Sequence, residues 1–152
     1  MPTNVKLTPL NGTFMGYHDQ LWGAVNASTE LWKLGEQQKA LKILDDAIAY
    51  WVQERKQSSS IRTLCHHAAV LCHSAGDLSL VKHYYQQSLT HSPDNPMALY
   101  GLAEVALEQG DTDLARQYAK RSYDATVQGD DEIAKHGLLD LIAMKWPDIA
   151  PK

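Results

Sequence analysis

The chain has 152 residues and a formal net charge of −4, with 14 Lys and Arg against 18 Asp and Glu. This length suits one domain with a working core, and the charge balance excludes a general binder of nucleic acid or of anionic membranes, which needs a basic surface. No run of about 18 apolar residues is present, so no membrane insertion is predicted.

Residues 1–15 are predicted to form an irregular arm, because two prolines and a glycine interrupt a largely polar stretch. The arm holds one lysine and no apolar h-region, so we do not interpret it as a secretory signal. Its apolar residues, Val5, Leu7, Leu10 and Phe14, are candidates to dock on a neighbouring surface of this chain or of a second copy.

After the arm, apolar and small residues recur at helical spacing, whereas no stretch alternates with period two, so we predict helices and no sheet. The predicted helices are residues 16–34, 36–55, 61–74, 78–90, 97–109, 112–126 and 130–145. Gly35, Gly76 and Gly110 each separate two of them, since glycine readily adopts the left-handed backbone that ends a helix. Residues 56–60 are all polar, so we predict a hinge there in which one of the three serines caps the next helix.

Small residues, turn residues and acidic residues recur with a period of 34 residues, which is typical of helical repeats. The residues that recur are Ala69, Gly76, Asp77, Val81 and Ser88, followed by Ala103, Gly110, Asp111, Ala115 and Ser122. The spacing from Gly35 to Gly76 is 41 residues, which places seven extra residues at positions 55–61. Gly137 lies 34 residues after Ala103, so the last helix is predicted to be half of a fourth unit.

These offsets, together with Pro93-Asp94-Asn95 between two units, make the chain resemble the tetratricopeptide repeat family. The units are residues 21–54, 62–95 and 96–129, with a cap at 130–146 and a tail at 147–152. The resemblance implies an all-α fold over residues 16–146, an α-α superhelix (solenoid) of three helix-turn-helix repeats with a C-terminal capping helix. Helix pairs this short bury their apolar faces only by stacking on neighbours.

The resemblance also implies a concave groove, lined by the first helix of each repeat, that binds a peptide or a partner protein. Carried over by offset, the groove residues are Trp22, Asn26, Thr29, Lys33, His66, His67, Val70, His73, Tyr100, Glu104, Glu108 and Lys135. Rigid aromatic side chains supply contact area there, and polar groups set the register of the partner. The resemblance therefore implies that the protein is a cytoplasmic, non-catalytic adaptor or scaffold without a cofactor.

Members of the family that grip the acidic C-terminus of heat-shock chaperones use a clamp of Lys, Asn, Asn, Lys and Arg. The matching positions are Val25, Thr29, His67, Met97 and Gly101. None of these five residues is the one that the clamp needs at its position. A terminal carboxylate would therefore lack its charge-assisted hydrogen bonds, and we exclude this co-chaperone function.

Chaperones of type III secretion translocators resemble this chain in length, in acidic net charge and in having three repeats. A chaperone of a secretion-system client therefore stays an alternative, as does a self-associating scaffold, a possible homodimer.

The histidines and cysteines of residues 65–73 raise the alternative of a metal or cofactor site. His66 and His73 lie two helical turns apart, about 10 Å, which is too far for one ion. Cys65 and Cys72 have the same separation, too long for a disulfide, and we interpret them as buried, reduced thiols. The histidines are more simply groove residues whose protonation makes binding depend on pH. No nucleophile turn, phosphate loop or dinucleotide motif is present, so catalysis is not predicted.

Overall fold

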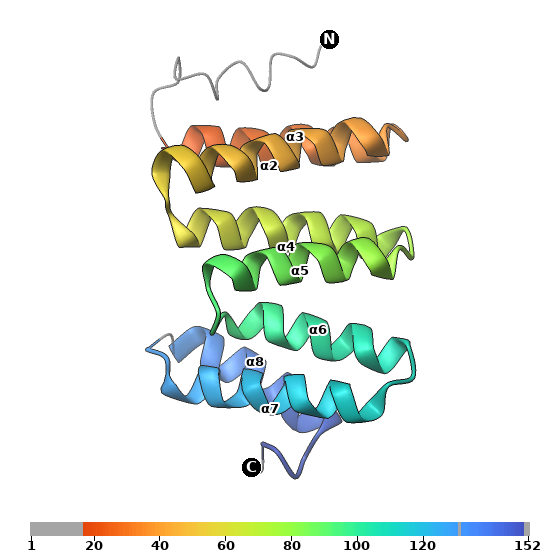
Figure 1. Cartoon of the computed structure of the whole chain (residues 1–152), viewed down its shortest axis with the longest axis vertical. Coiled ribbons are helices and arrows are strands. Elements are labelled where there is room, and N and C mark those ends of the chain that lie inside the picture. Colours follow the sequence, from red (N-terminus) through yellow and green to blue (C-terminus); the bar gives the residue numbers. More distant parts are fainter. Residues whose placement is uncertain (1–16, 131, 151–152) are drawn as a thin grey trace. The chain divides into compact units, whose positions relative to one another are not determined.

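The computed structural model describes residues 17–130 and 132–150, so the predicted arm at residues 1–15 lies outside the described residues. Regular structure in the described part is helical throughout, without a strand, as the apolar spacing predicts (Figure 1). The helices are α2 (Tyr17–Lys33), α3 (Gln37–Tyr50), the π-helical turn η2 (Trp51–Arg55), α4 (Ser58–Ser74), α5 (Leu78–His91), α6 (Pro96–Glu108), α7 (Thr112–Gln128) and α8 (Glu132–Lys145). None of these helices has the length and apolar character needed to cross a membrane.

The chain divides into two compact units, Met1–Asp77 and Leu78–Lys152, which we call unit 1 and unit 2. In unit 1, α2 and α3 form an antiparallel pair and α4 packs on both of them. The backbone φ angles of Gly35, Gly76 and Gly110 are +84°, +76° and +84°, which confirms that each ends a helix in the left-handed conformation. The core of unit 1 is built around fully buried large side chains such as Leu44, Trp51 and Leu64.

The predicted hinge at residues 56–60 is wrong in most of its length. The three serines form the first turn of α4, and the residue that precedes α4 is Gln57, whose side chain makes no capping hydrogen bond. Before it, α3 continues into the π turn η2, where Lys56 N donates to Trp51 O at 2.6 Å. The seven extra residues are therefore absorbed by a π turn and a longer α4, because Lys56 reverses the chain within two residues.

Lys56→Gly is expected to raise the free energy of unfolding by about 1 kcal/mol. Lys56 has a φ of +52°, a left-handed conformation that strains any side chain with a Cβ but not glycine. Chemical denaturation of the two proteins measures the difference. Gln57→Gly is the matched control, since Gln57 is extended with a φ of −98° and should lose stability on the same change. Equal effects at both positions would contradict the assigned strain.

Unit 2 contains α5, α6, α7 and α8, with α6 at its centre. Helix α6 is buried almost all round, including Leu99, Leu102 and Val105, because neighbouring helices pack on several of its sides. The core extends beyond α8: Trp146 and Ala150 are buried against α6 and α7. Part of the predicted tail, residues 147–150, thus contributes to the core.

Two serines stand where close packing favours alanine, and each forms a hydrogen bond within unit 2. Ser88 Oγ accepts from the side-chain amide of Asn95 at 2.9 Å, while Asn95 Oδ1 accepts from Met97 N at 3.2 Å and caps α6. Ser122 Oγ donates to Pro96 O at 2.9 Å. The serines therefore keep helices close, as small residues do, and also satisfy buried polar groups at the start of α6.

Candidate partner-binding site

Eight of the predicted groove residues lie on two contacting helices of unit 1, and we call the surface they form the α2/α4 face. Its members are Trp22, Asn26, Thr29 and Lys33 on α2, and His66, His67, Val70 and His73 on α4. Residues three and four apart share one side of a helix, which explains why each set forms a single row. The buried residues Leu64, Ala68 and Ala69 occupy the opposite, packed side of α4.

The α2/α4 face is open and combines apolar with polar groups. Trp22 and Val70 are each 48% exposed, which is unusual for large apolar side chains. Asn26, His66 and His73 are also exposed, although both histidines have a polar, ring or electrostatic contact within the chain. A surface with an exposed tryptophan and a rim of amide and imidazole groups has the composition of a protein contact site.

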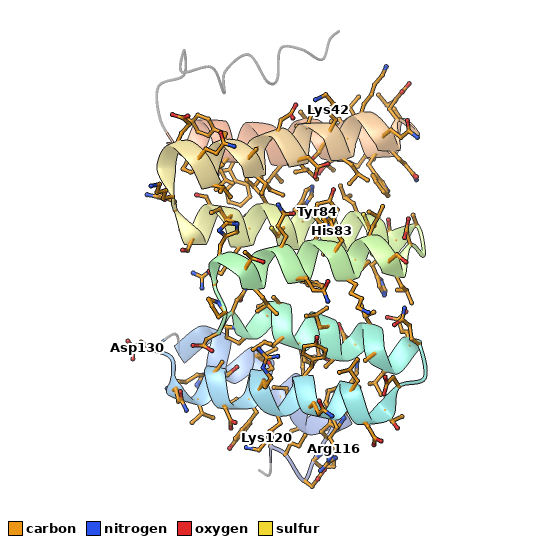
Figure 2. The ribbon with its side chains drawn as sticks, in the orientation of Figure 1. Lys42, His83, Tyr84, Arg116, Lys120 and Asp130 are labelled. Carbon is orange, nitrogen blue, oxygen red and sulfur yellow. The ribbon has the colours of Figure 1, made fainter. Side chains whose placement is uncertain are left out.

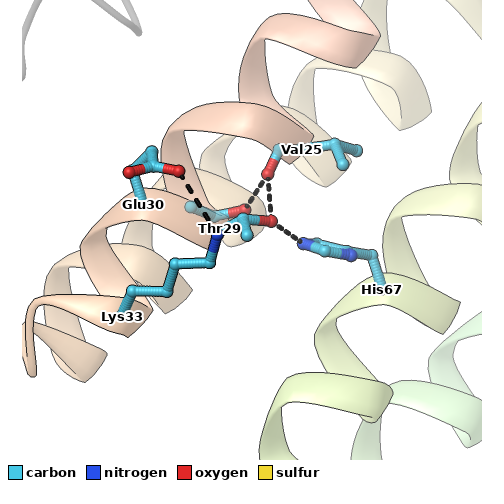
Figure 3. Close-up of polar contacts among 6 residues, drawn as sticks. Val25, Thr29, Glu30, Lys33 and His67 are labelled. Atoms are coloured by element: carbon cyan, nitrogen blue, oxygen red, sulfur yellow. Dashed lines mark hydrogen bonds and ion pairs between the residues drawn. The ribbon is translucent and has the colours of Figure 1, made fainter.

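One hydrogen bond joins the two helices across this face, between Thr29 Oγ1 and His67 Nε2 at 3.0 Å (Figure 3). The Thr29 hydroxyl also donates to Val25 O at 2.8 Å. Because a hydroxyl has a single hydrogen, His67 Nε2 must be the donor in the bond to Thr29. This assignment leaves Nδ1 as the nitrogen that gains a proton when His67 becomes charged.

Partial burial, and secondly the charge of His66, lower the pKa of His67 below its ordinary value. Burial also lowers the pKa of His66, although that residue remains exposed at the surface. The unfolded chain regains the ordinary histidine pKa of about 6.5. Between the two pKa values the unfolded chain holds more protons, so the free energy of unfolding falls as pH drops below about 6.5.

His67→Gln is therefore expected to reduce the loss of stability between about pH 7.5 and about pH 5.5, since glutamine takes up no proton. Denaturation of both proteins at the two pH values measures this loss. Thr29→Val is the control, because it removes the hydroxyl but keeps the imidazole. It should lower stability by about 1 kcal/mol at both pH values and retain the acid-dependent loss. Identical acid losses in wild type and His67→Gln would contradict the role assigned to His67.

The cysteines of α4 lie in the core of unit 1. Cys65 and Cys72 are free and fully buried, and burial, followed by the charges of nearby carboxylates, raises their pKa to about 12 and about 11. Such thiols are poor metal ligands and poor nucleophiles. Within residues 17–130 and 132–150, no three His, Cys, Asp or Glu side chains are grouped to hold a metal ion.

In unit 2, two predicted groove residues, Tyr100 and Glu104, contact the end of α8. Tyr100 is 4% exposed and lies edge-on to Trp146, with 6.4 Å between ring centroids. Lys145 Nζ is 2.8 Å from Glu104 Oε2 and 5.5 Å from the centre of the Tyr100 ring. Burial by itself lowers the pKa of Lys145, but the hydrogen bond and charge of Glu104, together with Tyr100, outweigh it and raise that pKa overall. Tyr100 thus packs in the core, where the predicted groove needs it exposed.

The remaining predicted residues of unit 2 are Glu108, which is exposed, and Lys135, which is half-buried. The sequence pattern did not lead us to two residues of these surfaces, Arg62 and Lys145. Arg62 is exposed and precedes His66 by one helical turn, so helical spacing alone predicts that the two residues are neighbours on α4. Lys145 follows Glu104 by 41 residues, and no local pattern indicates that contact.

Residues 74–130 match the model of a family described as Tetratricopeptide repeat. The matched segment includes all of α5, α6 and α7, with Gly76 and Gly110 at its turns. No curated protein matches the chain. The helix pairing and the left-handed glycines agree with this match.

Proposed function

Because this chain is a tetratricopeptide repeat protein, we propose that it is a non-catalytic adaptor or scaffold whose α2/α4 face binds a peptide or a partner protein. Repeats of this family generally mediate protein–protein interactions. The observation that carries the proposal is the exposure of Trp22 on α2 and Val70 on α4, 48% each, whereas Leu21, Ile61 and Leu64 of the same two helices are buried. Exposed apolar groups rimmed by polar ones mark interaction sites.

The corresponding surface of unit 2 is less suited to binding a partner, which supports the choice of the α2/α4 face. Its corresponding residues, Tyr100 and Glu104, already contact Trp146 and Lys145 of their own chain. A partner at that position would have to displace α8 from a packed core, whereas the α2/α4 face requires no such displacement. The free, buried cysteines further support a reducing compartment such as the cytoplasm.

Affinity capture with the full chain, followed by titration of the purified partner, tests the proposal. Trp22→Ser and Val70→Ser are each expected to weaken binding about tenfold or more, with unchanged helicity, because exposed anchors act in binding rather than in folding. Val127→Ser on α7 is the matched control, since Val127 is 46% exposed and lies outside the face. Full partner binding by both face variants would show that another surface is used.

Self-association is a second candidate, and one observation favours it. Leu141 and Met144 are 41% and 77% exposed and lie three residues apart on one side of α8. A second copy covering them would form a homodimer. Light scattering of the full chain over a range of concentrations tests this, and a constant monomer mass would exclude it.

A further inference from the structure

The exposed apolar part of the α2/α4 face begins close to the first residue of α2. Helix α2 starts at Tyr17, and Trp22 follows five residues later, about 8 Å along the helix axis. Trp22 on α2 and Val70 on α4 are each 48% exposed, and the two helices contact each other. Both side chains gain free energy when another apolar segment covers them.

Val70, the second of these side chains, lies farther along α2. The hydrogen bond between Thr29 Oγ1 and His67 Nε2, 3.0 Å long, fixes how α2 and α4 align (Figure 3). Thr29 follows Tyr17 by twelve residues, about 18 Å along the axis, and Val70 follows His67 by one turn of α4. A segment that enters at the start of α2 therefore has to extend about 20 Å to cover both apolar side chains.

The predicted arm, residues 1–15, carries apolar side chains and little charge. Val5, Leu7, Leu10 and Phe14 are apolar, and Lys6 is the only charged side chain among these fifteen residues. When such a segment covers apolar surface, both lose contact with water and little charge is desolvated. The composition of the arm therefore suits it to the exposed apolar part of the α2/α4 face.

The arm is attached at a point from which it can reach the whole face. Phe14 precedes Tyr17 by three residues and reaches at most about 10 Å from it, far enough to contact Trp22. Leu7 precedes Tyr17 by ten residues and reaches at most about 35 Å, which exceeds the length of the face. Gly16, directly before α2, lacks a Cβ, so the backbone there has the freedom to turn the arm back over the helix.

Attachment to α2 favours contact of the arm with its own chain over contact with a second copy. A segment joined to its site by a short linker has an effective concentration of roughly 1 mM there. A contact that is too weak to hold two separate molecules together at micromolar concentration therefore still forms within one molecule. A partner that binds the face more tightly than the arm displaces it.

We propose that the arm binds the α2/α4 face of its own chain, with its apolar side chains over Trp22 and Val70, and that a partner has to displace it. This inference rests on the proposed function and adds a means of regulating the same site. While the arm is bound, only the fraction of molecules with an open face accepts a partner. The apparent affinity of the partner is therefore reduced by that fraction.

Thiol labelling of the full chain tests the inference. Asn26→Cys places a thiol on the exposed side of α2, whereas the two native cysteines of α4 are buried and react slowly. In this background, the combined Leu7→Ser, Leu10→Ser and Phe14→Ser substitutions are expected to speed labelling at position 26 about fivefold, because the arm no longer covers the face. Gln117→Cys on α7 is the control, since Gln117 is exposed outside the face, and its labelling rate should not respond to the arm substitutions. Slow labelling of the native cysteines in every variant shows that unit 1 stays folded.

Two results overturn the inference. One is an equal labelling rate at position 26 with and without the arm substitutions. The other is a dimer mass in light scattering that the arm substitutions abolish, because the arm would then bind a second copy. If labelling is independent of the arm while Trp22→Ser and Val70→Ser abolish capture of the partner, the face is a binding site and only its regulation is wrong. If those two variants capture the partner normally, the proposed function itself is wrong.

Discussion

Gly101→Ala is expected to lower the free energy of unfolding of unit 2 by about 2 kcal/mol, although alanine is the better helix former. A Cβ on Gly101 would lie 2.8 Å from Tyr85 Cδ2, and two further ring carbons of Tyr85 would be closer still. Real Cβ atoms essentially never show such contacts, so the ring or α6 must move.

The Tyr85 ring has little room to move. It is 9% exposed, and burial, followed by the charge of Glu104, raises the pKa of its hydroxyl to about 12. The absence of a side chain at position 101 thus allows α5 and α6 to approach closely in unit 2. Gly101 occupies one of the clamp positions of the chaperone-binding members, but here its role is packing.

A double-mutant cycle isolates this contact. In a Tyr85→Ala background, Gly101→Ala should become stabilising by about 1 kcal/mol, since the steric conflict is gone and only helix propensity remains. Gly23→Ala in α2 is the matched control, because nothing lies within 4 Å of its added Cβ, and it should stabilise by a similar amount. Denaturant titration measures all variants. A stabilising Gly101→Ala in the wild-type background would refute the close approach.

Trp146→Ala is expected to have the largest effect of the substitutions considered, a loss of about 3–5 kcal/mol from the free energy of unfolding of unit 2. Trp146 is 6% exposed, packs in the core with Ile142 and Ala150, and meets Tyr100 edge-on. Removing the indole leaves a cavity that the surrounding helices fill only in part.

The same substitution weakens the attachment of the residues after α8. Asp148 follows Trp146 by two residues and pairs with Arg116 of α7, which is labelled in Figure 2. This exposed ion pair is too weak to hold the segment alone. Near-UV circular dichroism should lose the signal of the Tyr100–Trp146 pair, and denaturation should give the stability change. Met144→Ala, at a residue 77% exposed on α8, is the control and should change stability by less than about 0.5 kcal/mol. Equal effects at 144 and 146 would contradict the packing of Trp146.

The sequence alone was sufficient to predict the helical architecture, because the buried side of a helix and its ends depend on residues that are close together in the chain. Apolar spacing specifies which side of each helix is buried, and a glycine at the end of a helix supports the left-handed turn that Gly35, Gly76 and Gly110 adopt. The 34-residue period identified the repeats, and the match of residues 74–130 to the Tetratricopeptide repeat family agrees. The row of α4 histidines follows from the same helical geometry.

Tertiary structure alone decided which of the predicted groove residues are accessible. Tyr100 is buried because Trp146, 46 residues later, packs against it, and Glu104 is engaged because Lys145 reaches it. The bond from His67 to Thr29 likewise joins residues 38 apart. Helical periodicity determines the direction of a side chain from its own helix, but burial depends on what another segment places over it. That placement arises from packing between distant segments, which a local pattern does not contain.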